Sequence, residues 1–305
     1  MAADAVTAVT VRTSEPPRLR MIDRMRAVHS HREILMNLVR KELKVKYAHS
    51  LLGAIWSLLN PLVFLAVFTF VSKVLGSAIP HYAVYLLSGL LAWNLFSVSL
   101  LTGARSVVDN ANLVKKVAFP REILPLSSVG VALVDYVLQM AVLLLFIVAS
   151  GYGFHVPELA LFPLAFVTVL VFTVAMTFWM AALNVRYRDV QHLLNVGLLV
   201  WFWATPIVYG SWQVQNMLGN RAIWGMSLFD LYFVNPLTPI TLALQRSLYA
   251  FISPLSDGQP VPVLAHVSLP WSAIVTGLVL VGSMLLLRLT WGTFFHLSGD
   301  FAEEL

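Results

Sequence analysis

The side chains that could carry out catalysis are sparse in this sequence, and their spacing matches no common catalytic site. No lysine follows a glycine, so the chain lacks the Gly-Lys pair of a phosphate-binding loop. It has no cysteine, which excludes disulfides, thiolate metal sites and cysteine nucleophiles. No His-x-x-x-His or Glu-x-x-His spacing falls on a predicted helix. We therefore expect no catalytic residue, no metal and no nucleotide site in this chain.

One ionisable residue stands out because it lies inside a long apolar stretch. Asp135 falls within residues 123–149, which otherwise carry no charge. An ionisable group at membrane depth is costly, so a functional role is one hypothesis. The alternative is that Asp135 lies nearer the end of its segment and pairs with Lys116 or Arg121. The sequence leaves both open.

Segment 110–125 reads NANLVKKVAFPREILP and combines positive charge with the pattern of a short helix. Asn112 is predicted to cap a helix over residues 113–118, and Pro120 is predicted to end it. A short amphipathic helix between two spans is suited to insertion into a groove of a soluble partner. An ordinary basic loop explains the same residues equally well.

A second charged turn, Asn-Val-Arg-Tyr-Arg-Asp-Val at residues 184–190, follows a later apolar stretch. Its alternating charges are compatible with lipid headgroups or with a protein partner. A solvated turn without a specific ligand is the simpler interpretation.

Composition places the chain in a membrane. Of its 305 residues, 59% are hydrophobic and 11% charged, and the mean hydropathy is +0.79. A soluble domain carries about 25% charged residues, so lipid must cover much of this surface. The net charge of +5 and the pI near 9.6 are explained by basic cytosolic loops, without a nucleic-acid partner.

The apolar pattern predicts an all-α polytopic membrane protein with six transmembrane helices. A span needs about 20 apolar residues, and six stretches satisfy this: 54–75, 84–107, 123–149, 159–183, 190–209 and 271–289. The proline-rich segment 210–270 separates the last two. Its apolar part, 237–251, is too short to span, which predicts a re-entrant or interfacial helix.

The first span is preceded by two different segments. Residues 1–30 lack the apolar core of a signal peptide and are predicted to form a disordered cytosolic arm, while residues 31–305 form the transmembrane domain. Residues 31–47 are predicted to form an amphipathic helix at the membrane interface, with a basic polar face. Glu42 falls on the apolar side of this helix, so we expect it to have a partner.

The distribution of Lys and Arg predicts the orientation. Residues 1–54 hold ten of them, the connection after the second span holds four and the connection after the fourth holds two. The opposite side holds three, although it includes the longest loop. Because cations favour the cytosolic side, both termini are predicted to be cytoplasmic, which agrees with an even number of spans.

Aromatic side chains are frequent in the first and fifth spans. Rings that face a lumen could stack against sugar rings, whereas rings that face lipid or a neighbouring helix are the more common case. The candidates for lining a channel are Phe64, Phe68, Trp201, Trp203 and Tyr209.

Five ordered motifs carry a resemblance to a known family. They are RKELKVKY at 40–47 followed by SLLGAIW at 50–56 and Pro61, KKVAFPREILP at 115–125, NVRYRDV at 184–190, PIVY at 206–209 and NPLTP at 235–239. In this order the chain resembles the membrane subunit of bacterial ATP-binding-cassette polysaccharide exporters, which serve O-antigens, teichoic acids, capsules and galactan. The resemblance extends from about residue 30 to the end of the chain.

The resemblance implies a homodimer of six-helix subunits in the bacterial cytoplasmic membrane, with a separate nucleotide-binding ATPase subunit under each. ATP and Mg would be bound by that partner, and this chain would hold no cofactor. Helix 31–47 resembles the interface helix, and the proline-rich outer segment resembles extracellular gate helices. The substrate would be a lipid-linked polysaccharide.

The same resemblance assigns expected roles to individual residues. The pyrophosphate headgroup of the substrate would meet Arg40, Lys41, Lys44 or Lys46. The residues expected to couple to the ATPase are Asn112, Leu113, Lys115, Lys116, Phe119, Pro120, Arg121 and Glu122 in the coupling helix, with Arg186, Tyr187, Arg188 and Asp189 in the second turn.

Two other classes of protein remain as alternatives. An integral-membrane transferase acting on lipid-linked sugars would need a cluster of carboxylates or histidines, whereas Glu122, Asp135 and Asp189 are dispersed in the sequence. A membrane scaffold without transport activity is the other. Among exporter substrates, the excess of arginine over lysine is compatible with a GC-rich genome and favours lipid-linked galactan.

Overall fold

The computed structural model describes most of the chain as helix. The described residues are 21–48, 55–74, 79, 81–149, 151–154, 156–219, 222–223, 226–249, 255–256, 259–260, 263–264, 267–299 and 301–304. Two hairpins of two-residue strands are also present, β1 (Ala222–Ile223) with β2 (Met226–Ser227) and β3 (Leu255–Ser256) with β4 (Gln259–Pro260). The predicted helical fold is therefore confirmed in its main feature.

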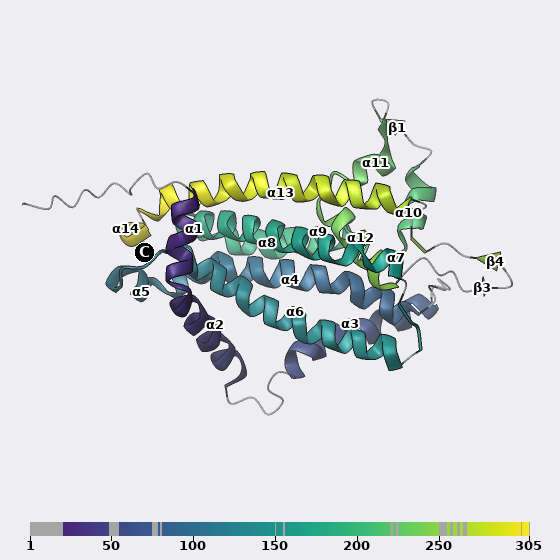
Figure 1. The fold of residues 1–305 in the computed structure, drawn as a ribbon, viewed down its shortest axis with the longest axis horizontal. Helices are drawn as coiled ribbons and strands as arrows, with labels where there is room; N and C mark the ends of the chain where they lie inside the picture. The colour runs from purple at the N-terminus through teal and green to yellow at the C-terminus, as the bar shows by residue number, and fades with distance from the viewer. Residues whose placement is uncertain are drawn as a thin grey trace, which may run out of the picture.

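Within the part of the chain that the structure describes, four helices are long and apolar enough to cross a membrane. They are α4 (Tyr82–Asp109), α6 (Ile123–Ala149), α7 with α8 (Val156–Leu159 and Leu161–Arg186) and α13 (Leu269–Ser298). They run side by side along the long axis of the molecule (Figure 1). These helices correspond to the second, third, fourth and sixth predicted spans.

The other two predicted spans fare differently. Helix α3 (Ile55–Val74) has 20 residues and agrees with the predicted stretch 54–75 within one residue at each end, and it contains Pro61. Helix α9 (Val190–Trp203) has 14 residues, about 21 Å at 1.5 Å per residue. That is shorter than the roughly 30 Å hydrocarbon core of a bilayer. The predicted continuous span 190–209 is thus wrong over 204–209, because the helix ends at Trp203.

The two ends of the bundle differ in character (Figure 1). Helices α1 (Met21–Ser30), α5 (Ala111–Lys116) and α14 (Phe301–Glu304) gather at one end, which we call the basic end. The other end carries α10 (Ser211–Leu218), α11 (Leu228–Tyr232) and the two hairpins. Helix α1 corrects the prediction of a disordered arm for residues 21–30, and residues 1–20 lie outside the described residues.

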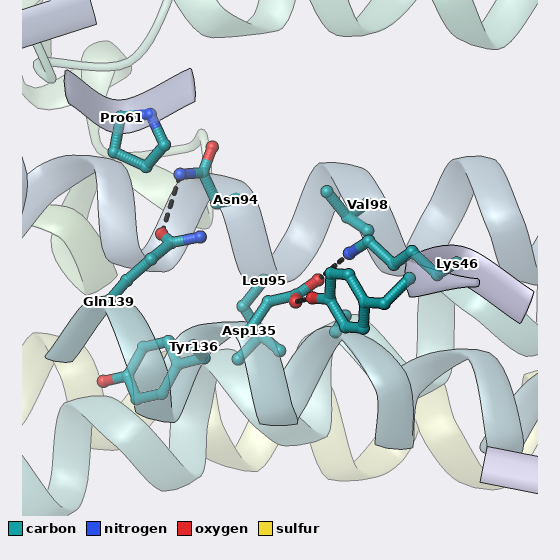
Figure 2. Close-up of a pocket in the computed structure, with 10 residues that line it drawn as sticks. Lys46, Pro61, Asn94, Leu95, Val98, Asp135, Tyr136 and Gln139 are labelled. Atoms are coloured by element: carbon teal, nitrogen blue, oxygen red, sulfur yellow. Dashed lines mark hydrogen bonds and ion pairs between the residues drawn. The ribbon is translucent and has the colours of Figure 1, made fainter. Parts of the chain in front are cut away.

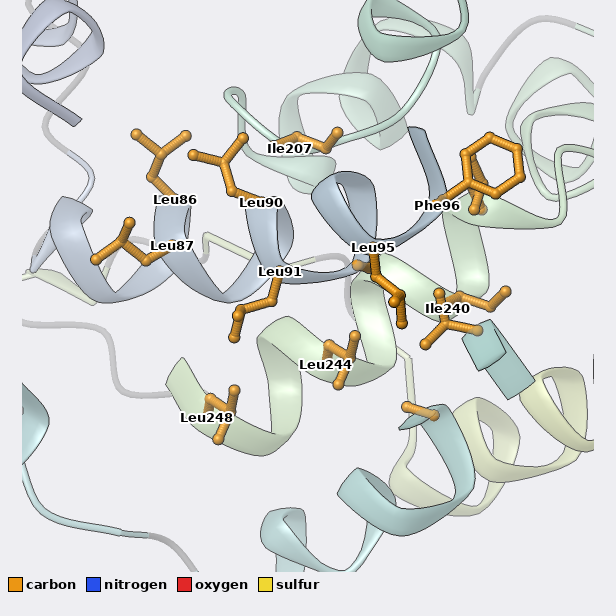
Figure 3. Packing of buried hydrophobic residues seen from close by; sticks show 14 of the residues in the cluster. Leu86, Leu87, Leu90, Leu91, Leu95, Phe96, Ile207, Ile240, Leu244 and Leu248 are labelled. Carbon is orange, nitrogen blue, oxygen red and sulfur yellow. The ribbon is translucent and has the colours of Figure 1, made fainter. Parts of the chain in front are cut away.

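Helix α4 forms the centre of the bundle. Its apolar side chains pack against those of α12 (Leu237–Tyr249) and the loop after α9 (Figure 3). Helix α12 is buried along most of its length, including polar residues such as Gln245. The predicted short helix after residue 237 is therefore present as α12 and is packed inside the bundle.

Buried polar side chains hold the loop that follows α9. Tyr85 of α4 donates a hydrogen bond to the carbonyl of Tyr209 at 2.6 Å, and Tyr82 donates to Val208 at 3.0 Å. The amide of Gln245 donates to the carbonyl of Pro206 at 2.9 Å. Carbonyls freed by the end of a helix are costly in an apolar environment unless they are paired. These donors therefore permit α9 to end inside the bundle.

Asn235 joins the end of α9 to the start of α12. Its amide donates to the carbonyl of Ala204 and to the hydroxyl of Thr205, both at 3.1 Å. Its carbonyl oxygen accepts from the indole of Trp201 at 2.7 Å and from the backbone of Leu237 at 3.1 Å. The motif NPLTP thus has a structural explanation, since Asn235 satisfies groups on both sides of the junction.

We expect Asn235→Ala to destabilise the folded chain. The change removes all four hydrogen bonds and leaves the partly buried indole N–H of Trp201 and the backbone N–H of Leu237 without this partner, at about 1–3 kcal/mol for a buried group left unsatisfied. The melting temperature of the purified chain in detergent should fall by several degrees. The matched variant Asn195→Ala, at an exposed position of α9, should leave it unchanged, and an equal effect of the two would contradict this interpretation.

Candidate functional site

The short helix at the basic end begins two residues earlier than predicted. Helix α5 spans Ala111–Lys116, and Asn110 occupies the N-cap position. Asn112 is therefore inside the helix and exposed, so its predicted capping role is wrong. The side chain of Asn110 instead donates to the carbonyl of Ser106 at 2.9 Å and accepts from Lys41 at 3.4 Å.

The exposed and buried faces of α5 are clearly separated. Lys115 and Lys116 are exposed, and Val117 beyond them is 49% exposed, whereas Val114 is buried. Phe119 packs against the apolar cluster that contains Val114. The two lysines thus project from a surface whose other side is anchored in the protein.

Glu122 does not lie at this surface. It is 4% exposed and accepts a hydrogen bond from the indole of Trp291 in α13 at 3.3 Å. Burial lowers the pKa of the Arg24 and Arg121 guanidinium groups, and the charge of Glu122 opposes that effect on both. Glu122 therefore lies inside the protein, where it joins the start of α6 to α13, and its coupling role stays a prediction.

The N-terminal helix α1 packs close to Glu122 and contacts α13. The guanidinium of Arg24 lies 3.5 Å from the centre of the Phe295 ring in α13, a cation–π contact. Sequence reasoning missed Arg24 and Trp291, because their roles depend on contacts between helices far apart in the chain.

The C-terminal helix α14 packs next to α5 and shares its apolar cluster. Phe301 is 1% exposed and its ring lies 5.4 Å from that of Phe294. Both belong to the apolar cluster that includes Val114 of α5 and Val185 of α8. Sequence patterns assign no role to residues 301–305, in which an aromatic residue precedes two acidic ones.

The second predicted turn is confirmed as an exposed element. Arg186, Tyr187, Arg188 and Asp189 are all exposed between α8 and α9. Because Val185 belongs to the cluster under α5, both basic segments rest on one apolar base. They form the surface that we call the docking surface: residues 112–121 and 186–189.

Helix α2 (Arg32–Tyr47) lies against α6. A side chain at Gly130 of α6 would come within 2.8 Å of Val39, so the two helices approach each other closely there. Of the predicted headgroup residues, Arg40 and Lys44 are exposed and Lys41 contacts Asn110. Helix α2 therefore connects the start of α5 with α6.

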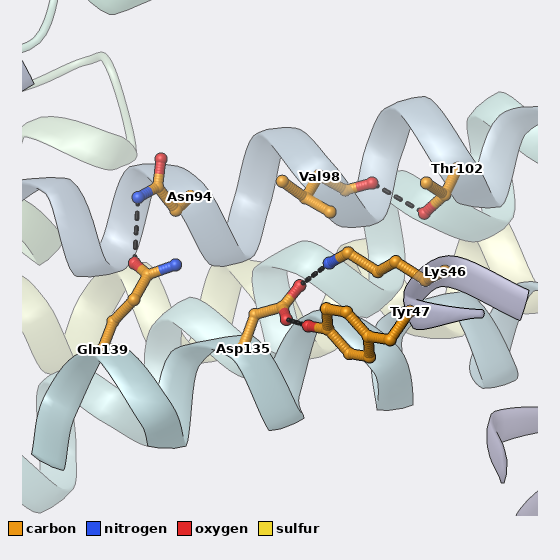
Figure 4. A network of polar contacts seen from close by, with 7 residues as sticks. All are labelled: Lys46, Tyr47, Asn94, Val98, Thr102, Asp135 and Gln139. Atoms are coloured by element: carbon orange, nitrogen blue, oxygen red, sulfur yellow. Dashed lines mark hydrogen bonds and ion pairs between the residues drawn. The ribbon is translucent and has the colours of Figure 1, made fainter. Parts of the chain in front are cut away.

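The end of α2 forms an ion pair with α6 (Figure 4). The ammonium of Lys46 lies 2.6 Å from Asp135 Oδ2, and the hydroxyl of Tyr47 donates to Asp135 Oδ1 at 2.9 Å. The predicted alternative partners Lys116 and Arg121 are therefore wrong. Lys46, predicted to meet a substrate headgroup, is engaged by this chain's own carboxylate.

A cavity of about 330 Å³ lies beside this pair (Figure 2). Its polar wall continues to Asn94 of α4, whose amide donates to the side-chain oxygen of Gln139 in α6 at 2.9 Å. A second cavity of about 490 Å³ shares Lys46 and Val98 with the first. Together they make a groove between α2, α4 and α6, which we call the α2 groove.

The half-buried Glu42 lines the α2 groove. Burial raises the pKa of its carboxyl, whereas the charges of Lys41 and Arg105 lower it. Among the described residues, no cation lies within 4.0 Å of Glu42. The expected direct partner was therefore not found.

The predicted channel aromatics fall into two groups. Phe68 of α3 contacts Phe64 at 5.8 Å and the exposed Trp203 of α9 at 6.2 Å between ring centres. Trp201 instead packs on Phe96 inside the subunit and donates to Asn235, which argues against its predicted channel role. The half-buried Tyr209 bonds to Tyr232 at 2.9 Å.

Comparisons with known proteins identify the family of this chain. Residues 34–249 match the family described as ABC-2 type transporter. The chain is 34% identical over 261 residues to the O-antigen export system permease protein RfbA of Myxococcus xanthus, covering 83% of this chain and 94% of that protein. It is 30% identical over 212 residues to RfbA of Klebsiella pneumoniae, covering 69% and 78%.

We expect Phe301→Ala to loosen the base of the docking surface. Truncation of a fully buried Phe costs about 3–5 kcal/mol, and here the cavity would open under α5. Limited proteolysis should cleave near residue 116 faster in this variant, and its melting temperature should fall. Phe146→Ala, at a 40% exposed position of α6, is the control. If both variants were cleaved near residue 116 at the same rate, α14 would not support α5.

Proposed function

The chain belongs to the ABC-2 transporter family, as a permease subunit of bacterial ATP-binding-cassette polysaccharide exporters, and on this premise we propose that it exports a lipid-linked polysaccharide using ATP hydrolysed by a separate subunit. The observation that carries the proposal is the docking surface. Two exposed basic segments lie on one apolar base, and the sequence has no phosphate-binding loop. Such a chain needs a partner to supply nucleotide energy.

The coupling is proposed to run from the docking surface into the bundle. Val114, on the buried side of α5, and Val185, near the end of α8, belong to one apolar cluster with Trp291 of α13. Close packing transmits a displacement with little loss, because packed interiors are nearly incompressible. A partner that binds ATP and Mg would therefore move α8 and α13 together.

The channel itself is proposed to need two copies of the chain. Helices α3 and α9 present exposed apolar side chains, among them Phe70 and Trp203, and the half-buried rings of Phe64 and Phe68 lie next to them. In a homodimer these rings would line an axis along which sugar rings slide. Six spans, with both termini cytoplasmic, complete this proposal and place the basic end in the cytosol.

The substrate class follows from the relatives and from composition. The proteins from Myxococcus xanthus and Klebsiella pneumoniae are described as O-antigen export permeases. The arginine-rich composition favours a galactan as the glycan that this chain exports.

The export function can be tested with the purified complex of this chain and its ATPase in lipid vesicles. The complex should hydrolyse ATP and move a lipid-linked glycan from the side of the ATPase into the vesicle. ATP hydrolysis without movement of the glycan would refute the export function.

We expect reversal of charge on α5 to separate the partner. Lys115→Glu with Lys116→Glu places negative charge on the docking surface, and repulsion or lost pairing should lower co-purification of the ATPase by about tenfold, or about 1.4 kcal/mol. Lys73→Glu, an exposed lysine of α3 away from the basic end, should have no effect. Normal co-purification and export by the double variant would exclude these lysines from docking.

A further inference from the structure

The α2 groove is not simply basic, although the sequence predicted a basic face for α2. Three cations line it, Lys41, Lys46 and Arg105, and so do three carboxylates: Glu42, Asp109 and Asp135. Arg105 lies 3.4 Å from Asp109, and Lys46 lies 2.6 Å from Asp135. The positive and negative charges that line the groove are equal in number. An anion that enters it is therefore strongly attracted only to a cation whose ion pair with a carboxylate has broken.

The Lys46 pair has the geometry of an anion site. An ammonium and a phenolic hydroxyl from adjacent residues donate to the two oxygens of one carboxylate (Figure 4). The same donors suit a phosphate, which accepts charge-assisted hydrogen bonds in the same distance range. Asp135 thus occupies a place that an external anion could take.

The surroundings of the pair also leave room for a ligand. The Lys46 side chain is 38% exposed, whereas that of Asp135 is 9% exposed. The adjoining cavity of about 330 Å³ is near the lower end of the volumes typical of ligand pockets. An ion pair that served only to hold two helices together would not need an open cavity beside its cation.

We infer that Lys46 and Tyr47 form a phosphate-binding site of the α2 groove, and that Asp135 is a built-in competitor that fills it when no ligand is bound. The ligand class is a lipid carrying a phosphate or diphosphate, with its polar head between α2 and α6 and its further polar groups toward Asn94 and Gln139. This inference rests on the proposed export function, to which it adds regulation of the entry site.

Exchange of the two anions has a mechanical consequence. Lys41 ties α2 to Asn110 before α5, and Val39 packs on Gly130 of α6. When a phosphate replaces Asp135 at Lys46, α6 loses its polar hold on α2 while α2 stays joined to the base of α5. Occupancy of the groove is thereby signalled to the docking surface.

The test measures binding of farnesyl diphosphate to the full chain in phosphatidylcholine nanodiscs without nucleotide. Asp135→Asn removes the competitor and should tighten binding by about tenfold, or about 1.4 kcal/mol. Lys46→Gln should weaken it by at least as much, and the double variant should bind no more tightly than Lys46→Gln alone. Asp230→Asn, at an exposed position of α11, is the matched control. Unchanged or weaker binding by Asp135→Asn overturns the inference.

Further arms separate folding and ligand source. If Asp135→Asn does not fold, Asp135→Ser also removes the carboxylate with a smaller side chain, and tighter binding is again expected; no gain refutes the competitor. Competition by inorganic pyrophosphate supports a phosphate site, whereas competition by phosphatidylglycerol alone would reassign it to bulk lipid and overturn the substrate role. If Asp135→Asn binds farnesyl diphosphate more tightly but the unsubstituted complex exports no glycan, the phosphate site is supported and the proposed export function is rejected.

Discussion

Inside a bilayer, every polar group that is withdrawn from water needs a partner within the protein, and this constraint shapes the whole molecule. Helix α9 stops after 14 residues because Tyr82, Tyr85 and Gln245 are available to the carbonyls that follow it. Gln245 in turn requires close approach of α12 to α4 at Gly89, where a Cβ would lie 2.9 Å from its amide nitrogen. The buried helix α12 and the shortened span are therefore one structural solution.

The same constraint explains the distribution of charge. Asp135 is retained in the apolar part of α6 because Lys46 and Tyr47 reach it from α2. Removing one member of a buried pair is strongly destabilising, whereas replacing both by apolar groups is often neutral. Stability alone thus does not explain a charged pair here, and an open cavity at its side favours a role in ligand exchange.

The sequence predicted those features that depend on local pattern. The apolar stretches located α4, α6, α8 and α13, and the motif around Lys115 and Lys116 located an exposed basic surface. It failed where contacts cross the fold. The pairing of Asp135 joins residues 89 positions apart, and the burial of Glu122 depends on Trp291, 169 positions away. No periodicity encodes such distances, so the partner of each acid had to come from the structure.

The docking surface and the α2 groove are connected through few contacts, and this decides how they can communicate. Lys41 and Asn110 join α2 to the loop before α5, while Val114 of α5 shares its apolar cluster with Leu38 of α2. A displacement of α5 by a partner must therefore carry α2 along or break these contacts. Since the last two residues of α2 hold Asp135, the ion pair is the part of the α2–α6 contact where we propose that a polar ligand competes. The side chains of Leu38 and Val39 are buried and offer no polar donor, so in the proposed exchange the apolar half of the contact persists.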